Sequence, residues 1–157
     1  MGLFNRVKYD EQSINVCYFE RLFDIDEISQ QLNFFQEAVN VYGLGLGNEL
    51  ENFFLDDSGK YRQQVEGGGE LSIEYNVCDD SSFITFYMKL PQSENSNNQN
   101  TLNQIFFILA MLLDKWGDTV GAFKHDGSHD DWHWKFQSLV TDDFRESVGK
   151  YIYGDEW

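Results

Sequence analysis

The sequence predicts an α+β fold in which three helices pack on a curved antiparallel sheet of six or seven strands. Segments of alternating apolar residues predict the strands, and three segments with apolar residues at helical spacing predict the helices. The 14 Phe, 8 Tyr and 4 Trp residues supply enough apolar surface for a core. The predicted order is strand, helix, four strands, helix, two strands, helix, which is typical of α+β folds. A chain of this length is expected to form one domain, residues 1–157.

A strand and an amphipathic helix are predicted first. Residues 13–19 alternate, with apolar side chains on one side of the strand. Asp24 is expected to cap the following helix, with Glu27 completing a capping box, and Gly43 is expected to end it about 18 residues later. The apolar stripe of this helix is predicted to consist of Ile25, Ile28, Leu32, Phe35 and Val39.

Four strands are predicted between the first and second helices. Residues 52–55 and 61–65 flank the turn-forming residues 56–59, which indicates a hairpin. Residues 71–77 alternate and predict a strand with one buried face. Residues 83–90 carry bulky side chains on both faces, which predicts a central strand.

The second half of the chain is predicted to hold two helices and two short strands. A polar loop, residues 92–100, precedes a helix that Thr101 and Gln104 would cap and Gly117 would end. The two strands are predicted at residues 119–124 and 132–136. The last helix is expected to start at the cap Thr141, with Asp142 and Asp143 favourably placed in its first turn.

The charge of the chain predicts what kind of partner it binds. The sequence has 27 acidic against 11 basic residues, a net charge of -16. An acidic surface on a folded domain repels nucleic acid and attracts cationic partners. We therefore expect a protein partner with a cationic surface, and neither nucleic acid nor a membrane.

The cellular setting is predicted from the cysteines and the apolar runs. Two cysteines, Cys17 and Cys78, are expected to be buried thiols in a reducing cytoplasm. The first residues contain no apolar run long enough for a signal peptide. The longest apolar run, residues 105–113, covers about half a membrane span and is interpreted as a buried helix.

A histidine cluster is the strongest candidate for chemistry. His125, His129 and His133 are spaced four residues apart and lie among carboxylates, so they could supply ligands to a divalent metal. Gly127 and Ser128 would break the helix that this spacing needs, although His125 and His133 could meet across a hairpin. An exposed polar hairpin without metal is the favoured interpretation. No catalytic triad or cofactor motif is visible, so the protein is predicted not to be an enzyme and to need no cofactor.

Candidate partner-binding residues combine acid with large aromatic side chains. Trp residues dominate binding hot spots, and carboxylates steer a cationic partner. A core role for the tryptophans, and a role in turns and caps for the aspartates, are the alternatives. The candidates are Asp126, Asp130, Asp131, Trp132, Trp134, Asp142, Asp143 and Trp157.

From Asp24 onward, the order of predicted elements resembles the small acidic chaperones of bacterial type III secretion, the Tir-chaperone-like fold. The resemblance lies mainly in the apolar helix Leu102–Trp116, the short strand after Gly117, the strand Trp132–Phe136 and the helix that starts at Thr141. It implies a helix, three strands, a helix, two strands and a helix, and a chaperone that holds a secreted effector. The predicted N-terminal strand and the additional hairpin strand depart from that pattern.

These observations predict a non-catalytic intracellular protein that binds and masks one specific partner. An immunity protein that neutralises a bacterial toxin is the favoured role. A secretion chaperone for an effector is the alternative, and an acidic nucleic-acid mimic that inhibits a DNA-binding system is a further one. The monomeric or homodimeric state is left open.

Overall fold

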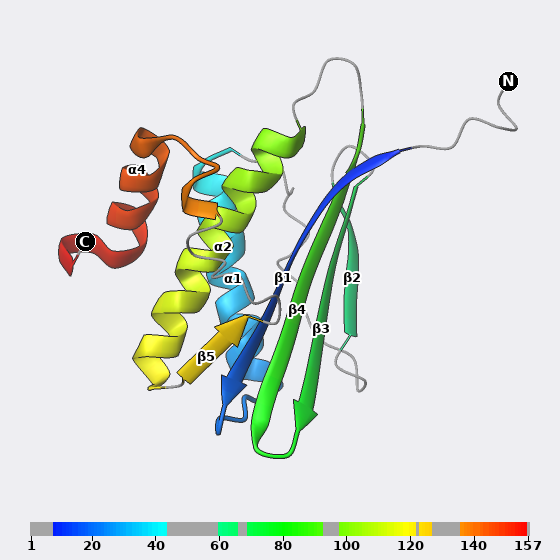
Figure 1. The fold of residues 1–157 in the computed structure, drawn as a ribbon, viewed down its shortest axis with the longest axis vertical. Coiled ribbons are helices and arrows are strands. Elements are labelled where there is room, and N and C mark those ends of the chain that lie inside the picture. The colour runs from blue at the N-terminus through cyan, green and yellow to red at the C-terminus, as the bar shows by residue number, and fades with distance from the viewer. Residues whose placement is uncertain are drawn as a thin grey trace, which may run out of the picture.

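The chain folds as an α+β structure with its helices on one face of an antiparallel sheet (Figure 1). The computed structural model describes residues 8–43, 60–65, 69–92, 98–121, 123–126 and 136–156. In chain order the elements are β1 (Tyr9–Phe19), α1 (Ile25–Val41), β2 (Lys60–Val65), β3 (Gly69–Cys78), β4 (Ser81–Pro91), α2 (Asn98–Val120), β5 (Phe123–Asp126), α4 (Asp142–Tyr153) and the short 3-10 helix η2 (Gly154–Glu156).

The sheet has five strands among the described residues, in the order β2-β3-β4-β1-β5. Each neighbouring pair is antiparallel. The predicted central strand, residues 83–90, is the middle strand β4. The prediction of six or seven strands is not supported, because three described strands rather than four lie between α1 and α2. The predicted strand at residues 52–55 lies outside the described residues.

Alternation along the strands separates the two faces of the sheet. The face toward the helices buries Ile14, Val16 and Tyr18 of β1, as the sequence predicts, and also Leu71, Ile73, Ile84, Phe86 and Met88. In β3 the buried face ends before Val77, which is 51% exposed. The prediction of two buried thiols is half wrong, because Cys17 is buried and Cys78 is exposed.

The helices α1 and α4 begin at the predicted caps. The Asp24 carboxylate accepts from the Glu27 backbone N–H at 2.8 Å, and the Glu27 side chain accepts from the Asp24 N–H at 3.0 Å. At α4 the Thr141 hydroxyl accepts from the Phe144 N–H at 3.2 Å. These bonds satisfy N–H groups that have no partner within the first helical turn.

The helix α2 is longer at both ends than the sequence predicts. It begins at Asn98, whose side-chain amide donates to the carbonyl of Pro91 at 2.6 Å, so the Thr101 capping box is wrong. It continues through Gly117, which is buried inside the helix, and stops before Gly121, whose φ is +67°. A glycine inside a helix costs only about 1 kcal/mol. Burial of Trp116 beside Gly117 offsets that cost, and the strand predicted from residue 119 starts only at Phe123.

The core lies between the helices and the inner face of the sheet, with α2 at its centre. Phe106 and Phe107 of α2 are each 1% exposed. Phe106 stacks on Phe136 with ring centroids 5.9 Å apart, and Phe107 meets Phe144 of α4 at 6.1 Å. Phe136 lies in a helical turn and not at the end of the predicted strand 132–136. Residues 132–135 lie outside the described residues. None of the described helices is long and apolar enough to cross a membrane.

Candidate functional site

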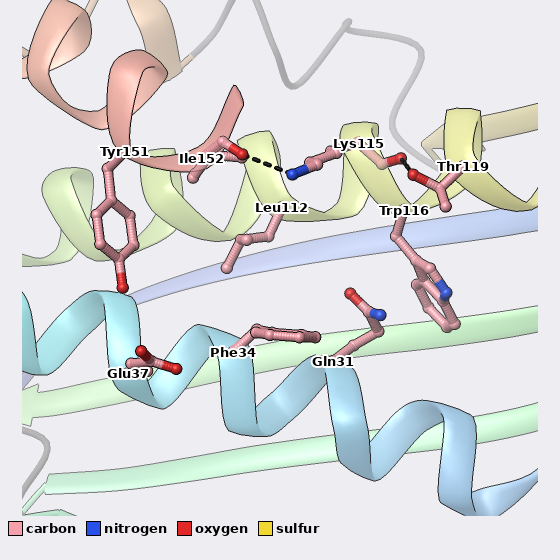
Figure 2. Close-up of a pocket in the computed structure, with 9 residues that line it drawn as sticks. All are labelled: Gln31, Phe34, Glu37, Leu112, Lys115, Trp116, Thr119, Tyr151 and Ile152. Atoms are coloured by element: carbon pink, nitrogen blue, oxygen red, sulfur yellow. Dashed lines mark hydrogen bonds between the residues drawn. The ribbon is translucent and has the colours of Figure 1, made fainter. Parts of the chain in front are cut away.

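A groove lies on the helical side of the molecule (Figure 2). It has a volume of about 450 Å³. Residues of α1, α2 and α4 line it, with apolar side chains between a few polar ones. They are Gln31, Phe34, Glu37, Leu112, Lys115, Trp116, Thr119, Tyr151 and Ile152, and we call this set the groove.

The wall from α1 is set by helical spacing. The stripe that contains Ile28, Leu32 and Phe35 packs into the core. Gln31, Phe34 and Glu37 recur every third residue, so they form a second row beside that stripe. The core takes Phe35 and leaves its neighbour Phe34 48% exposed on the groove.

The wall from α2 is fixed to α4 by a lysine. The Lys115 ammonium donates to the carbonyl of Ile152 at 2.6 Å, near the end of α4. The Thr119 hydroxyl donates to the Lys115 carbonyl at 2.8 Å. A cation at the last turn of a helix meets its free carbonyls and the negative end of its dipole. The Lys115 ammonium therefore points toward α4. Figure 2 shows that it points away from Glu37, which lies on α1.

The wall from α4 is formed by Tyr151, which contacts another aromatic ring on one side and is exposed on the other. Tyr42, the C-cap of α1, lies edge-on to Phe144 at 5.3 Å and to Tyr151 at 6.1 Å. Tyr151 itself is 42% exposed and points toward α1, where Glu37 and Phe34 lie (Figure 2). Partial burial, followed by the negative charge of Glu37 and the nearby Tyr42, raises the pKa of Tyr151. The phenol is therefore neutral at physiological pH.

The floor of the groove rests on a rigid aromatic contact. The ring of Trp116 lies 4.2 Å from that of Phe23 and 5.3 Å from that of Tyr18. Tyr18 is fully buried, and its hydroxyl donates to the carbonyl of Leu113 at 2.9 Å. Burial, with the charges of Asp114 and Asp118 adding to it, raises the pKa of Tyr18. Ring contacts and this hydrogen bond thus connect Trp116 and α2 to β1.

Among the described helices and strands, the excess of acidic over basic residues lies mainly in the helices. We call α1, α2, α4 and η2 the helical layer. It carries ten acidic residues and three basic ones. The five strands carry five acidic and four basic residues. The three cations of the helical layer are engaged internally: Lys115 with Ile152, Arg145 with Asp142 at 2.8 Å, and Lys150 with Glu146 at 4.0 Å.

The candidate residues from the sequence lie only partly within the described structure. Asp142 and Asp143 are exposed in the first turn of α4, at the opposite end of that helix from Tyr151. Asp126 is the last residue of β5, opposite Val16. Asp130, Asp131, Trp132, Trp134 and Trp157 lie outside the described residues. The described candidates therefore do not line the groove, and their role in binding stays a prediction.

The candidate residues chosen from the sequence did not include Phe34, Glu37 or Tyr151. A signal for the two aromatic residues was present, because on an amphipathic helix with one exposed face the neighbour of a core residue points away from the core stripe. Phe34 directly precedes the core residue Phe35, and Tyr151 directly precedes Ile152. Both were open to recognition as aromatics that project from a helix surface.

The histidine cluster can be placed only at its first member. His125 lies in β5 opposite Cys17 of β1, and His129 and His133 lie outside the described residues. Within the parts of the chain that the structure describes, no three His, Cys, Asp or Glu side chains gather as a metal site would require. In the groove, the Lys115 ammonium and the Thr119 hydroxyl each donate a hydrogen bond to a backbone carbonyl.

Comparison of the chain with family models, curated proteins and solved structures finds no match.

Proposed function

We propose that this protein is a non-catalytic binding protein that masks a cationic surface of one specific partner protein. The observation that carries the proposal is the excess of acid on the helical layer, around a groove with exposed aromatic side chains. Complementary charge speeds association, and buried aromatic anchors slow dissociation. An immunity protein that neutralises a bacterial toxin fits these needs, because nuclease toxins bind phosphates through basic surfaces.

A secretion chaperone for an effector is the second candidate. From α1 onward the described order is a helix, three strands, a helix, a strand and a helix. Three strands between the first two helices is the number in the secretion-chaperone pattern, so this observation favours the alternative. Both roles would place the protein in a bacterial cytoplasm.

The test starts with the identity of the partner. The tagged protein is cross-linked in cells of its source organism, and cross-linked peptides are identified by mass spectrometry. We expect a basic protein whose cross-links reach the helical layer. A toxin would support the immunity role and an effector would support the chaperone role. A DNA-binding enzyme cross-linked through its nucleic-acid site would point to mimicry of nucleic acid instead.

Binding kinetics then test the charge argument. The association rate should fall steeply between about 0.05 and 0.5 M salt, while the dissociation rate changes little. Glu37→Lys on the helical layer should slow association, and Glu74→Lys on the far side of the sheet serves as the matched control. A partner with an acidic contact surface, or equal effects of the two substitutions, would contradict the proposal.

A further inference from the structure

Two exposed aromatic side chains face each other across the groove. Phe34 of α1 is 48% exposed and Tyr151 of α4 is 42% exposed. Leu112 lies on α2 above the Phe34 ring, and Trp116, which is 6% exposed, lies toward the other end of the groove from Tyr151 (Figure 2). Exposed aromatic surface that frames a cavity marks an interaction site more often than isolated apolar residues do.

A carboxylate that forms no ion pair with another described residue lies on the rim of the groove. No cation in the described residues lies within ion-pair distance of Glu37. Lys115, the one cation that lines the groove, is held by the Ile152 carbonyl at 2.6 Å. Figure 2 shows the Glu37 carboxylate below the hydroxyl end of Tyr151, with the Phe34 ring next to it on α1. The groove therefore offers aromatic faces and one negative charge to a ligand.

We propose that the groove receives an arginine side chain of the partner protein, an inference that rests on the proposed function. The aliphatic stem would pack on Phe34 and Leu112. The guanidinium would lie against the Tyr151 ring and donate to the Glu37 carboxylate. The cavity of about 450 Å³ is large enough for such a side chain.

Arginine suits the groove better than an apolar or an acidic side chain. A guanidinium is planar, weakly hydrated and able to stack on aromatic rings while it donates two parallel hydrogen bonds to a carboxylate. A purely apolar side chain would cover Glu37 and leave its charge desolvated without a partner. An acidic side chain would meet the excess negative charge of the helical layer.

The test uses three small probes that share a three-carbon stem. N-acetyl-arginine methylamide is the ligand, the citrulline derivative is its neutral isostere, and the norleucine derivative is the apolar control. Each is titrated into ¹⁵N-labelled full-length protein, and amide shifts are followed by NMR. We expect the arginine probe to shift the amides of residues 31–37 and 151–152 with a dissociation constant of about 1–10 mM. Both controls should bind at least about fivefold more weakly, because a cation–π contact and an ion pair are lost.

Matched variants locate the contacts. Glu37→Gln and Phe34→Ala should each weaken the arginine probe about three- to tenfold. Glu74→Gln and Phe83→Ala, on strands β3 and β4, should leave its binding unchanged. Thermal unfolding of all four variants checks that each is folded. Equal binding of the norleucine probe, shifts confined to another surface, or no shift at about 50 mM arginine probe would overturn the inference.

The outcome separates this inference from the proposed function. If a cationic partner binds with steep salt dependence but Glu37→Gln and Phe34→Ala leave its affinity unchanged, the groove assignment fails and the proposed function stands. If the partner proves acidic, the proposed function fails whatever the arginine probe does.

Discussion

The two faces of the sheet handle polar groups in different ways, although the same strands build both. The inner face packs against the helices and is apolar, so the charged residues on this side of the molecule lie on the helical layer. On the outer face, charges of opposite sign lie opposite one another: Lys89 of β4 is flanked by Glu11 of β1 and Glu70 of β3. The Lys89 ammonium also lies 4.5 Å from the centre of the Tyr9 ring.

The difference bears on which surface would bind the proposed partner. On the outer face the Tyr87 hydroxyl donates to Glu11, so this tyrosine has a partner within the protein. The helical layer has a large acid excess and a groove whose aromatic rims are open. A surface whose charges are already compensated gains little from a partner, whereas an uncompensated one gains counter-charge. The following predictions test this contrast.

The largest expected effect compares two phenylalanines of β4. Phe86 points inward and is 3% exposed, whereas Phe83 points outward and is 40% exposed. Phe86→Ala should lower the free energy of unfolding by about 3–5 kcal/mol, because it leaves a cavity in the core. Phe83→Ala should cost less than about 1 kcal/mol. Urea denaturation measures both. Similar losses would mean that another part of the chain, or a second copy, covers the outer face.

An intermediate effect compares two tyrosines in alkaline solution. Burial raises the pKa of Tyr18 on the inner face above its usual 10.0. The hydrogen bond to Glu11, with partial burial, raises the pKa of Tyr87 on the outer face to about 12. Since both folded-state pKa values exceed the unfolded one, the stability that these phenols contribute is complete below pH 10 and is lost as pH rises.

Tyr18→Phe should therefore cost about 1 kcal/mol at pH 7, through the lost bond to Leu113. It should also flatten the fall of stability above pH 10 clearly. Tyr87→Phe should change stability at pH 7 by less than about 0.5 kcal/mol and flatten the alkaline fall only slightly. Unfolding curves between pH 7 and about 12 give both comparisons. A steeper alkaline fall in Tyr18→Phe than in the unmodified protein would contradict the account of its burial.

The smallest effect compares two glutamates without any partner present. Glu37→Gln removes repulsion from the acidic helical layer, so it should raise stability at low salt by about 0.2–0.5 kcal/mol. Glu74 lies opposite Lys60 in the sheet and accepts from the Asn76 amide at 3.1 Å, so Glu74→Gln should be neutral or slightly destabilising. The two differences should shrink when salt is added. The opposite order of the two variants would argue against an uncompensated helical layer.

Elements whose start or pattern is decided locally were predicted well from the sequence. The Asp24 capping box and the Thr141 cap each involve residues within one turn of each other. The alternation of β1 can be recognised from the sequence of that strand alone. The ends of α2 were predicted wrongly because distant contacts set them. Asn98 is held by Pro91 of β4, and Gly117 stays helical because the core holds Trp116 on one side of it.

The groove could not be predicted as a site, although its members carry a signal. Phe34, Lys115 and Tyr151 come from three helices, and only their packing brings them to one cavity. Because Lys115 points toward Ile152, it does not pair with Glu37 across the groove. No pattern in the sequence shows that direction. The acid excess itself was visible in the composition, but its concentration on the helical layer follows from the fold.

The place of β1 in the sheet has a consequence for how the chain is synthesised. β1 is made first, yet it lies between β4 and β5. Tyr18 pairs with Ser82, Tyr9 pairs with Pro91, and Phe19 pairs with Phe123, so each partner is translated dozens of residues later. Such a high contact order makes folding slow, because long loops must close before the contacts that stabilise them exist. The nascent chain therefore leaves the ribosome with β1 unpaired, and the described sheet can be completed only after β5 has emerged.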